Sequence, residues 1–228
     1  YGGQCTNSKI HGNIKGRNGT DVGACAPFRR LHLCDQHLSY MEAEKIKNKH
    51  NLLLEVCYAA KYEGQSLVKK YNEYKERNHD SDTDICTALA RSFADIGDIV
   101  RGKDLFIGYN EKDQEEKKQL QENLKKIFGN IYEELKNGKN GHTLKTRYKD
   151  DAPYYFQLRE DWWYANRRQV WKAIRCSAPT DAKYFIKTAC SGGTSPTQGK
   201  CRCVTHDVPT YFDYVPQYLR WFEEWAED

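Results

Sequence analysis

The residues best suited to chemistry are three cysteines and a histidine in the C-terminal third of the chain, Cys190, Cys201, Cys203 and His206. Thiolate and imidazole groups are common zinc ligands, so a metal site is one interpretation. The spacing C-x10-C-x-C-x2-H matches none of the usual structural zinc sites. Disulfide bonds are the interpretation that we favour, and we expect no metal and no cofactor.

Acid–base catalysis has one candidate pair, Glu160 and Asp161. Adjacent residues of a helix diverge by about 100°, so these two carboxylates could not flank one bond. Gly192-Gly193 precedes neither a Lys-Ser/Thr pair nor an apolar strand, as a phosphate-binding loop would require. The sequence therefore predicts a binding protein and not an enzyme.

A basic segment without any acidic residue occupies residues 136–149, KNGKNGHTLKTRYK. Its glycines and asparagines predict a turn-rich loop. Such a cluster suits a sulfated polysaccharide, because neutralising a dense anionic chain releases its counterions. A solvated loop without a partner is the alternative. The candidate glycan-binding residues are Lys136, Lys139, Lys145, Arg147 and Lys149.

A second pair of cations, Arg29 and Arg30, lies between Cys25 and Cys34. These arginines suit a surface site for a glycan anion, and we include them as glycan-binding candidates. The alternative, which we favour, is a structural use in which they tie this segment to acidic groups of the core. The residue pattern leaves both uses open.

Apolar residues at helical spacing predict an all-α chain. One helix is expected from Asn51 to about Tyr71, and a second from Asp82 or Thr83 to a C-terminal Gly102. Asn110 should begin a third helix that Gly138 ends. The remaining helices are expected at 158–174 and from Pro216 onward.

Three tryptophans concentrate aromatic mass in the helix expected at 158–174. Trp162, Trp163 and Trp171 could each remove roughly 150–250 Å² from water, which predicts a buried hub for the other helices. A tryptophan-lined ligand cleft is the alternative.

Nine cysteines in 228 residues indicate an oxidising, extracellular compartment. That compartment and a net charge of only +4 argue against a nucleic-acid partner. No apolar run approaches 18 residues, so we expect no insertion into a membrane. The odd cysteine number and the acidic, uncapped end of the last helix lead us to expect that the natural domain continues beyond Asp228.

Four long stretches of the chain taken together have a specific pattern. They are CAPFRRLHLCDQHL from Cys25, ICTALARSFADIGDIVRG from Ile85, LREDWWYANRRQVWKAI from Leu158 and DYVPQYLRWFEEWAED from Asp213. These stretches resemble the Duffy-binding-like domains, in particular the α class from the N-terminal head of Plasmodium falciparum erythrocyte membrane protein 1. They occur in the family's order and span nearly the whole chain.

The resemblance implies a disulfide-bonded helical bundle with long irregular segments. Subdomain 1 would be the mostly irregular residues 1–60, subdomain 2 the helical residues 61–228, and the family's third subdomain would be absent. It also implies a disulfide between Cys86 and Cys176, from the start of the second helix to the end of the tryptophan helix.

The function implied by the resemblance is adhesion at the outer face of the infected erythrocyte. We expect red-cell or endothelial glycans as receptors, either heparan sulfate-like chains or blood-group sugars, in rosetting or cytoadherence. A host protein receptor or immunoglobulin is the alternative, and neighbouring domains of the same chain are further partners. A scaffold and antigenic surface without a ligand of its own is the third interpretation.

Overall fold

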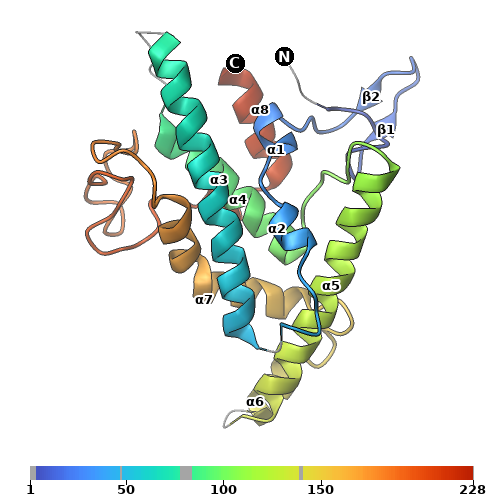
Figure 1. The fold of residues 1–228 in the computed structure, drawn as a ribbon. Helices are drawn as coiled ribbons and strands as arrows, with labels where there is room; N and C mark the ends of the chain where they lie inside the picture. Colours follow the sequence, from blue (N-terminus) through green and yellow to red (C-terminus); the bar gives the residue numbers. More distant parts are fainter. Residues whose placement is uncertain (1–3, 47, 78–83, 139–140, 228) are drawn as a thin grey trace.

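The computed structural model describes residues 4–46, 48–77, 84–138 and 141–227. Helices dominate it, which confirms the expected all-α class, and Figure 1 shows their arrangement. The only paired strands of these residues, β1 (Ile14–Lys15) and β2 (Asp21–Val22), form a small antiparallel hairpin. The helices are α1 (Phe28–Leu31), α2 (Gln36–Ser39), α3 (Lys49–Arg77), α4 (Ile85–Arg101), α5 (Glu111–Lys136), α6 (Gly141–Arg147), α7 (Phe156–Ile174), the 3-10 turn η1 (Phe212–Tyr214) and α8 (Gln217–Glu227).

Side-chain caps fix the ends of several helices. The carboxylate of Asp84 accepts a hydrogen bond from the backbone N–H of Cys86 at the start of α4, and Gly102 ends that helix in the left-handed conformation, as predicted. Asn110 caps α5, also as predicted. At α3 the capping residue is Asn48 and not Asn51, because the Asn48 side chain accepts from the N–H of Asn51. The expected start of the second helix at residues 82–83 lies outside the described residues.

Helix α4 is the most enclosed long helix of the described chain. Nearly all of its residues are buried, and it packs against α3, α7, α8 and η1. At Gly97 the helix comes close to α7, because an added Cβ would lie 2.8 Å from the ring of Trp163. Trp163 also packs on Phe93 with ring centroids 5.2 Å apart. All three tryptophans of α7 are buried, so they form one wall of a core whose centre is α4.

Two carboxylates on α4 are buried among arginines. Asp95 contacts Arg29 of α1 and Arg220 of α8, each at 2.7 Å. Asp98 pairs with Arg101 at 3.0 Å and also with Arg220. Helix α4 therefore holds the N-terminal segment and the last helix through charged hydrogen bonds as well as through apolar contacts.

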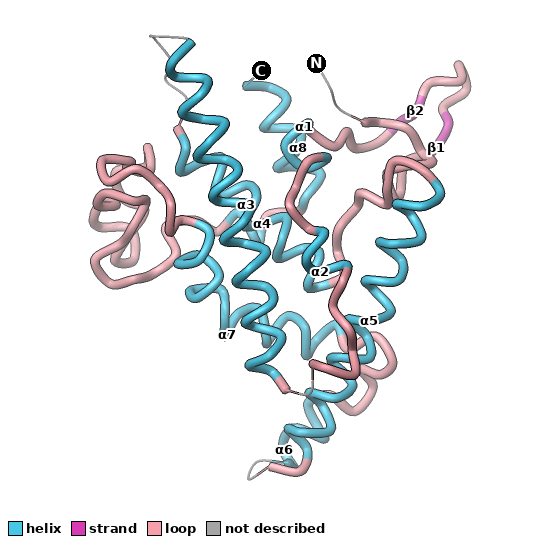
Figure 2. The backbone as a smooth tube through the Cα atoms, viewed as in Figure 1, coloured by secondary structure: helices cyan, strands magenta, loops and turns pink. Residues whose placement is uncertain are grey.

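Three disulfides occur in the described residues: Cys5–Cys25, Cys86–Cys201 and Cys190–Cys203. The expected Cys86–Cys176 bond is wrong. A turn in the irregular segment after α7, drawn pink in Figure 2, brings Cys201 to the start of α4, with 5.6 Å between the two Cα atoms. Cys176 follows the end of α7 and is exposed as a free thiol.

The predicted boundary between subdomain 1 (residues 1–60) and subdomain 2 (residues 61–228) falls inside α3. This helix runs without a break from Lys49 to Arg77. This division stays a prediction.

We predict that Cys201→Ser lowers the stability far more than Cys176→Ser. The Cys86–Cys201 bond closes a loop with a sequence separation of 115 residues. Its loss should cost about 4–5 kcal/mol in the chain-entropy model, whereas Cys176→Ser removes only a surface thiol. Urea unfolding of both variants measures the difference. A disulfide-linked peptide containing Cys176 in a tryptic map of the parent protein would contradict the connectivity.

Trp163→Ala should lower the free energy of unfolding by about 3–5 kcal/mol, because it empties a fully buried site beside Gly97. Its neighbour Tyr164 is 74% exposed, so Tyr164→Ala is the matched control and should change stability little. Thermal unfolding of the two variants tests this. Equal melting temperatures would show that the tryptophan does not support the core.

Candidate functional site

The cysteine and histidine cluster considered as a metal site is a pair of disulfides. Cys201 is bonded to Cys86 and Cys190 to Cys203, so no free thiolate of this cluster is left as a ligand. Within the described residues no three His, Cys, Asp or Glu side chains gather in a way that would hold a metal ion.

Arg29 and Arg30 serve a structural purpose, and their prediction as glycan-binding residues is wrong. The guanidinium of Arg29 donates two hydrogen bonds to Glu224, at 2.9 and 2.8 Å, besides contacting Asp95. Arg30 is 1% exposed and pairs with Asp104. Burial alone would lower the pKa of each arginine, but the neighbouring carboxylates outweigh it and raise the pKa above its ordinary value. Their charge is thus used within the fold.

The basic segment at 136–149 contains a helix, α6, where a loop was expected. Leu144 is partly buried and packs against the core, and Tyr148, four residues later, is 5% exposed. Tyr148 donates a hydrogen bond to Asp161 of α7 at 2.7 Å. Burial and then this bond raise the pKa of Tyr148 to about 12. This i, i+4 pair docks the segment and leaves Lys145 and Lys149 on the outside.

The five cations predicted in this segment differ in how far their charge is balanced. Arg147 makes two hydrogen bonds to Asp161, at 2.6 and 2.8 Å, which hold the pKa of that carboxyl below its ordinary value. Lys136 is paired with Glu133 on the preceding turn of α5. Lys139 lies outside the described residues. Lys145 and Lys149 are exposed and make no ion pair in the described part of the chain. We call Lys145, Arg147 and Lys149 the α6 surface.

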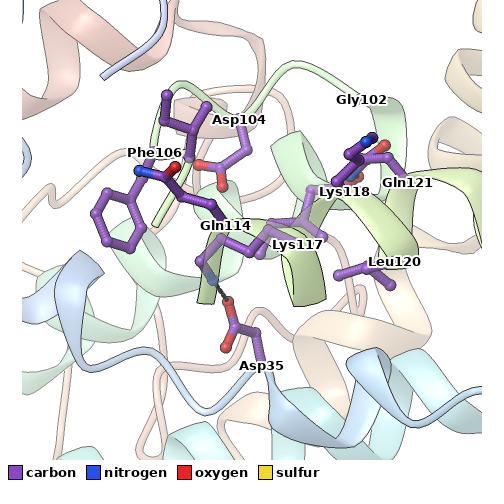
Figure 3. A pocket seen from close by; sticks show the side chains of 11 residues that line it. Asp35, Gly102, Asp104, Phe106, Gln114, Lys117, Lys118, Leu120 and Gln121 are labelled. Atoms are coloured by element: carbon purple, nitrogen blue, oxygen red, sulfur yellow. Dashed lines mark hydrogen bonds and ion pairs between the residues drawn. The ribbon is translucent and has the colours of Figure 1, made fainter. Parts of the chain in front are cut away.

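A cavity of about 220 Å³ lies between the first turns of α5 and the segment after α4 (Figure 3). Both lysines that line it are paired: Lys117 contacts Asp35 at 2.9 Å and Lys118 contacts Glu115 at 3.7 Å. Lys117 also lies over the ring of Phe106. The Lys117–Asp35 pair holds α5 against the N-terminal segment, and Phe106 belongs to the segment after α4. We therefore interpret the cavity as a packing feature.

An open groove of about 920 Å³ separates α7 from the irregular segment that follows it. Tyr164 and Tyr211 line it and are more than two-thirds exposed. This aromatic surface was not predicted, although the outward position of Tyr164, directly after two buried tryptophans, follows from helical periodicity.

Every helix in the described ranges falls short of the length and apolar character that crossing a bilayer requires.

Comparison with known proteins identifies the family. The profile of the Duffy binding domain matches residues 23–220. The Duffy receptor beta form of Plasmodium knowlesi is 26% identical over 99% of this chain, and the chain spans only 16% of that relative.

Solved structures support the same conclusion. The NTS-DBL1(alpha-1) domain of P. falciparum membrane protein 1 (PfEMP1), varO strain, is 43% identical with a TM-score of 0.77, over 99% of this chain and 47% of that one. A PfEMP1 DBLb domain bound to human ICAM-1 is 33% identical with a TM-score of 0.64, over 94% and 43% of the two chains. P. falciparum Erythrocyte Binding Antigen 140 region II in complex with sialyllactose is 26% identical with a TM-score of 0.54, over 90% and 26%.

These relatives are adhesion or receptor-binding modules and not enzymes, which confirms the expectation of a binding protein. The resemblance to the α class is confirmed as well. The profile match over most of the chain and the shared fold show that the chain belongs to the Duffy binding domain family.

Proposed function

We propose that this domain is exposed outside the infected erythrocyte and binds a sulfated, heparan sulfate-like glycan of a host cell through the α6 surface. The observation that supports the proposal is the exposure of Lys145 and Lys149 without acidic partners, beside Arg147, on a segment that Tyr148 anchors to α7. An anchored cationic surface loses little conformational freedom when a ligand binds.

The charge of this surface favours a sulfated chain over a neutral blood-group sugar. Each cation that contacts a sulfate displaces a condensed counterion, and this gain rises with the charge density of the ligand. Blood-group sugars offer no comparable charge. Three disulfides within the described residues fit an extracellular setting, where sulfated glycans occur and nucleic acid does not.

A protein receptor is the second candidate function. The exposed tyrosines of the groove beside α7 have the residue type that is enriched in protein interfaces. A related domain has been solved bound to human ICAM-1. Salt separates the two candidates, because an apolar interface survives an ionic strength that screens glycan binding.

We predict that replacing Lys145 and Lys149 by alanine lowers the salt concentration at which the domain elutes from immobilised heparin. The slope of log affinity against log salt should become shallower by about one for each cation that no longer meets a sulfate, or about two in all. Melting temperatures should match that of the parent, since both side chains are exposed.

The control for this experiment is Lys112→Ala with Lys118→Ala, which removes the same charge from an exposed face of α5. Equal elution of both double variants and the parent would show that the α6 surface does not bind the glycan. Equal losses in the two variants would show an effect of total charge and not of a site.

A further inference from the structure

A basic groove of about 680 Å³ lies at the C-terminal end of α7, between the end of that helix and the turn at residues 198–202. We call it the α7-end groove. No aspartate or glutamate occurs among the described residues that line it. Its cationic lining consists of Lys172, Arg175, Lys200 and Arg202, and His206 also lines it.

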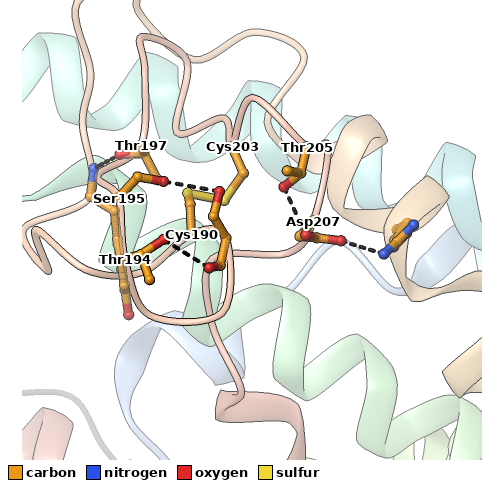
Figure 4. The surroundings of a disulfide bond; sticks show 10 residues. Cys190, Thr194, Ser195, Thr197, Cys203, Thr205 and Asp207 are labelled. Atoms are coloured by element: carbon orange, nitrogen blue, oxygen red, sulfur yellow. Dashed lines mark hydrogen bonds and ion pairs between the residues drawn. A yellow bond between two sulfur atoms is a disulfide. The ribbon is translucent and has the colours of Figure 1, made fainter.

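Two disulfides hold the turn that presents half of these cations. Along 200–203, basic residues alternate with the fully buried Cys201 and Cys203, which are bonded to α4 and to Cys190. Figure 4 shows the second of these bonds within the hydrogen-bonded loop. Gly199 lets the turn lie against Thr180, whose carbonyl oxygen would be 1.7 Å from an added Cβ. Lys200 and Arg202 are thus displayed on a fixed support.

Arg175 is the residue of this groove whose charge and Nε atom lack a partner in the described chain. It is 9% exposed, yet its Nε atom has no hydrogen-bond partner and its guanidinium forms no ion pair in the described chain. Burial, and then the charge of Arg202, lower its pKa. The Nε atoms of Arg91 and Arg220 are buried in the same way as that of Arg175, but both residues have partners elsewhere. The guanidinium of Arg220, for example, contacts Asp95 and Asp98. Two further buried arginines also differ from Arg175: Arg29 contacts carboxylates, and Arg159 donates to the carbonyl of Val100 at 2.6 Å.

The groups beside Arg175 do not balance its charge either. Arg202 donates to the side-chain oxygen of Gln198 at 2.8 Å, and Lys200 donates to the backbone carbonyl of Cys176 at 3.4 Å. Both acceptors are neutral. Cations near a helix C-terminus complement the helix dipole, which accounts for Lys172. The dipole does not account for a guanidinium that has no ion pair in the described chain and whose Nε atom is buried without a hydrogen-bond partner.

We propose that the α7-end groove binds an oxyanion, with Arg175 and Arg202 donating hydrogen bonds and Lys172 and Lys200 adding charge. The choice of a glycan sulfate as that oxyanion rests on the proposed function, whereas the anion site itself rests on Arg175. A tetrahedral oxyanion can accept several N–H donors at once, and charge-assisted bonds of this kind are among the strongest available to a protein.

The α6 surface and this groove lie along one face of α7. Residues 161, 168, 172 and 175 recur at spacings of seven, four and three, which places them on the same side of the helix. Arg175 follows Asp161, the partner of Arg147, by 14 residues, roughly 21 Å along the axis. Arg168 between them is paired with Asp207. The groove is therefore a second, separate contact point for a long anionic chain.

The free thiol of Cys176 lines the groove and serves as its reporter. The experiment measures the rate at which neutral iodoacetamide alkylates Cys176, read from the mass of its peptide, in sodium sulfate and in sodium chloride of equal ionic strength. A ligand at about four times its Kd should slow the reaction about fivefold by mass action. The same assay is run with a heparin oligosaccharide and with its desulfated form.

We expect protection by sulfate and by the heparin oligosaccharide, none by the desulfated form, and none in the Arg175→Gln, Arg202→Gln double variant. Lys183→Gln with Lys187→Gln, which removes the same charge from exposed positions of the same loop, should keep the protection. Circular dichroism and the melting temperature confirm that both double variants are folded.

Equal alkylation rates in sulfate and chloride would overturn the anion site, and so would protection that survives in the arginine double variant. Protection by inorganic sulfate but not by the oligosaccharide would overturn the assignment to a glycan. The Lys145→Ala, Lys149→Ala variant separates this inference from the α6 surface, because its Cys176 should still be protected by sulfate whatever its retention on heparin.

Discussion

The buried carboxylates of α4 are the constraint on which the arrangement of the chain depends. A charge removed from water is strongly unfavourable unless it is paired. Arg101 of the same helix supplies one cation to Asp98, but the remaining cations around Asp95 and Asp98 come from distant segments. Arg29 comes from the N-terminal segment and Arg220 from the last helix. Both segments must therefore reach α4 before its charges are balanced, and Figure 1 shows α1 beside α8, where Arg29 also meets Glu224.

The long helices could be predicted because their signals are local. Apolar periodicity and single capping residues, such as Asn110 and Gly102, act within a few residues of the structure that they specify. Helix α6 was missed because its Asn-Gly pairs suggested turns, although Leu144 and Tyr148 have the i, i+4 spacing of a docked helical face. The pairing of Cys86 could not be derived from the chain alone, since it depends on where a long irregular segment folds back.

The candidate site was less predictable than the fold, because a lysine or arginine is available to a ligand only if no carboxylate of the fold pairs with it. Arg29 and Lys145 are both basic residues in polar stretches, but the first faces Asp95 and Glu224 while the second faces solvent. Arg147 belongs to the predicted segment and is nevertheless paired with Asp161, on a different helix. Composition gives the number of charges, and only the tertiary fold decides which of them remain available to a ligand.

Helix α7 combines a face packed into the core with a face that carries cations. Its inner face carries Trp163, packed so tightly on Gly97 that the helix can shift little. Its outer face carries Lys172 and ends at Arg175, whose charge no carboxylate of the described chain balances. A rigid inner face lets the outer cations keep a fixed spacing, so a ligand need not order them. The disulfides of the following loop hold Lys200 and Arg202 on a fixed support as well, so the cations on both sides of the α7-end groove keep their spacing.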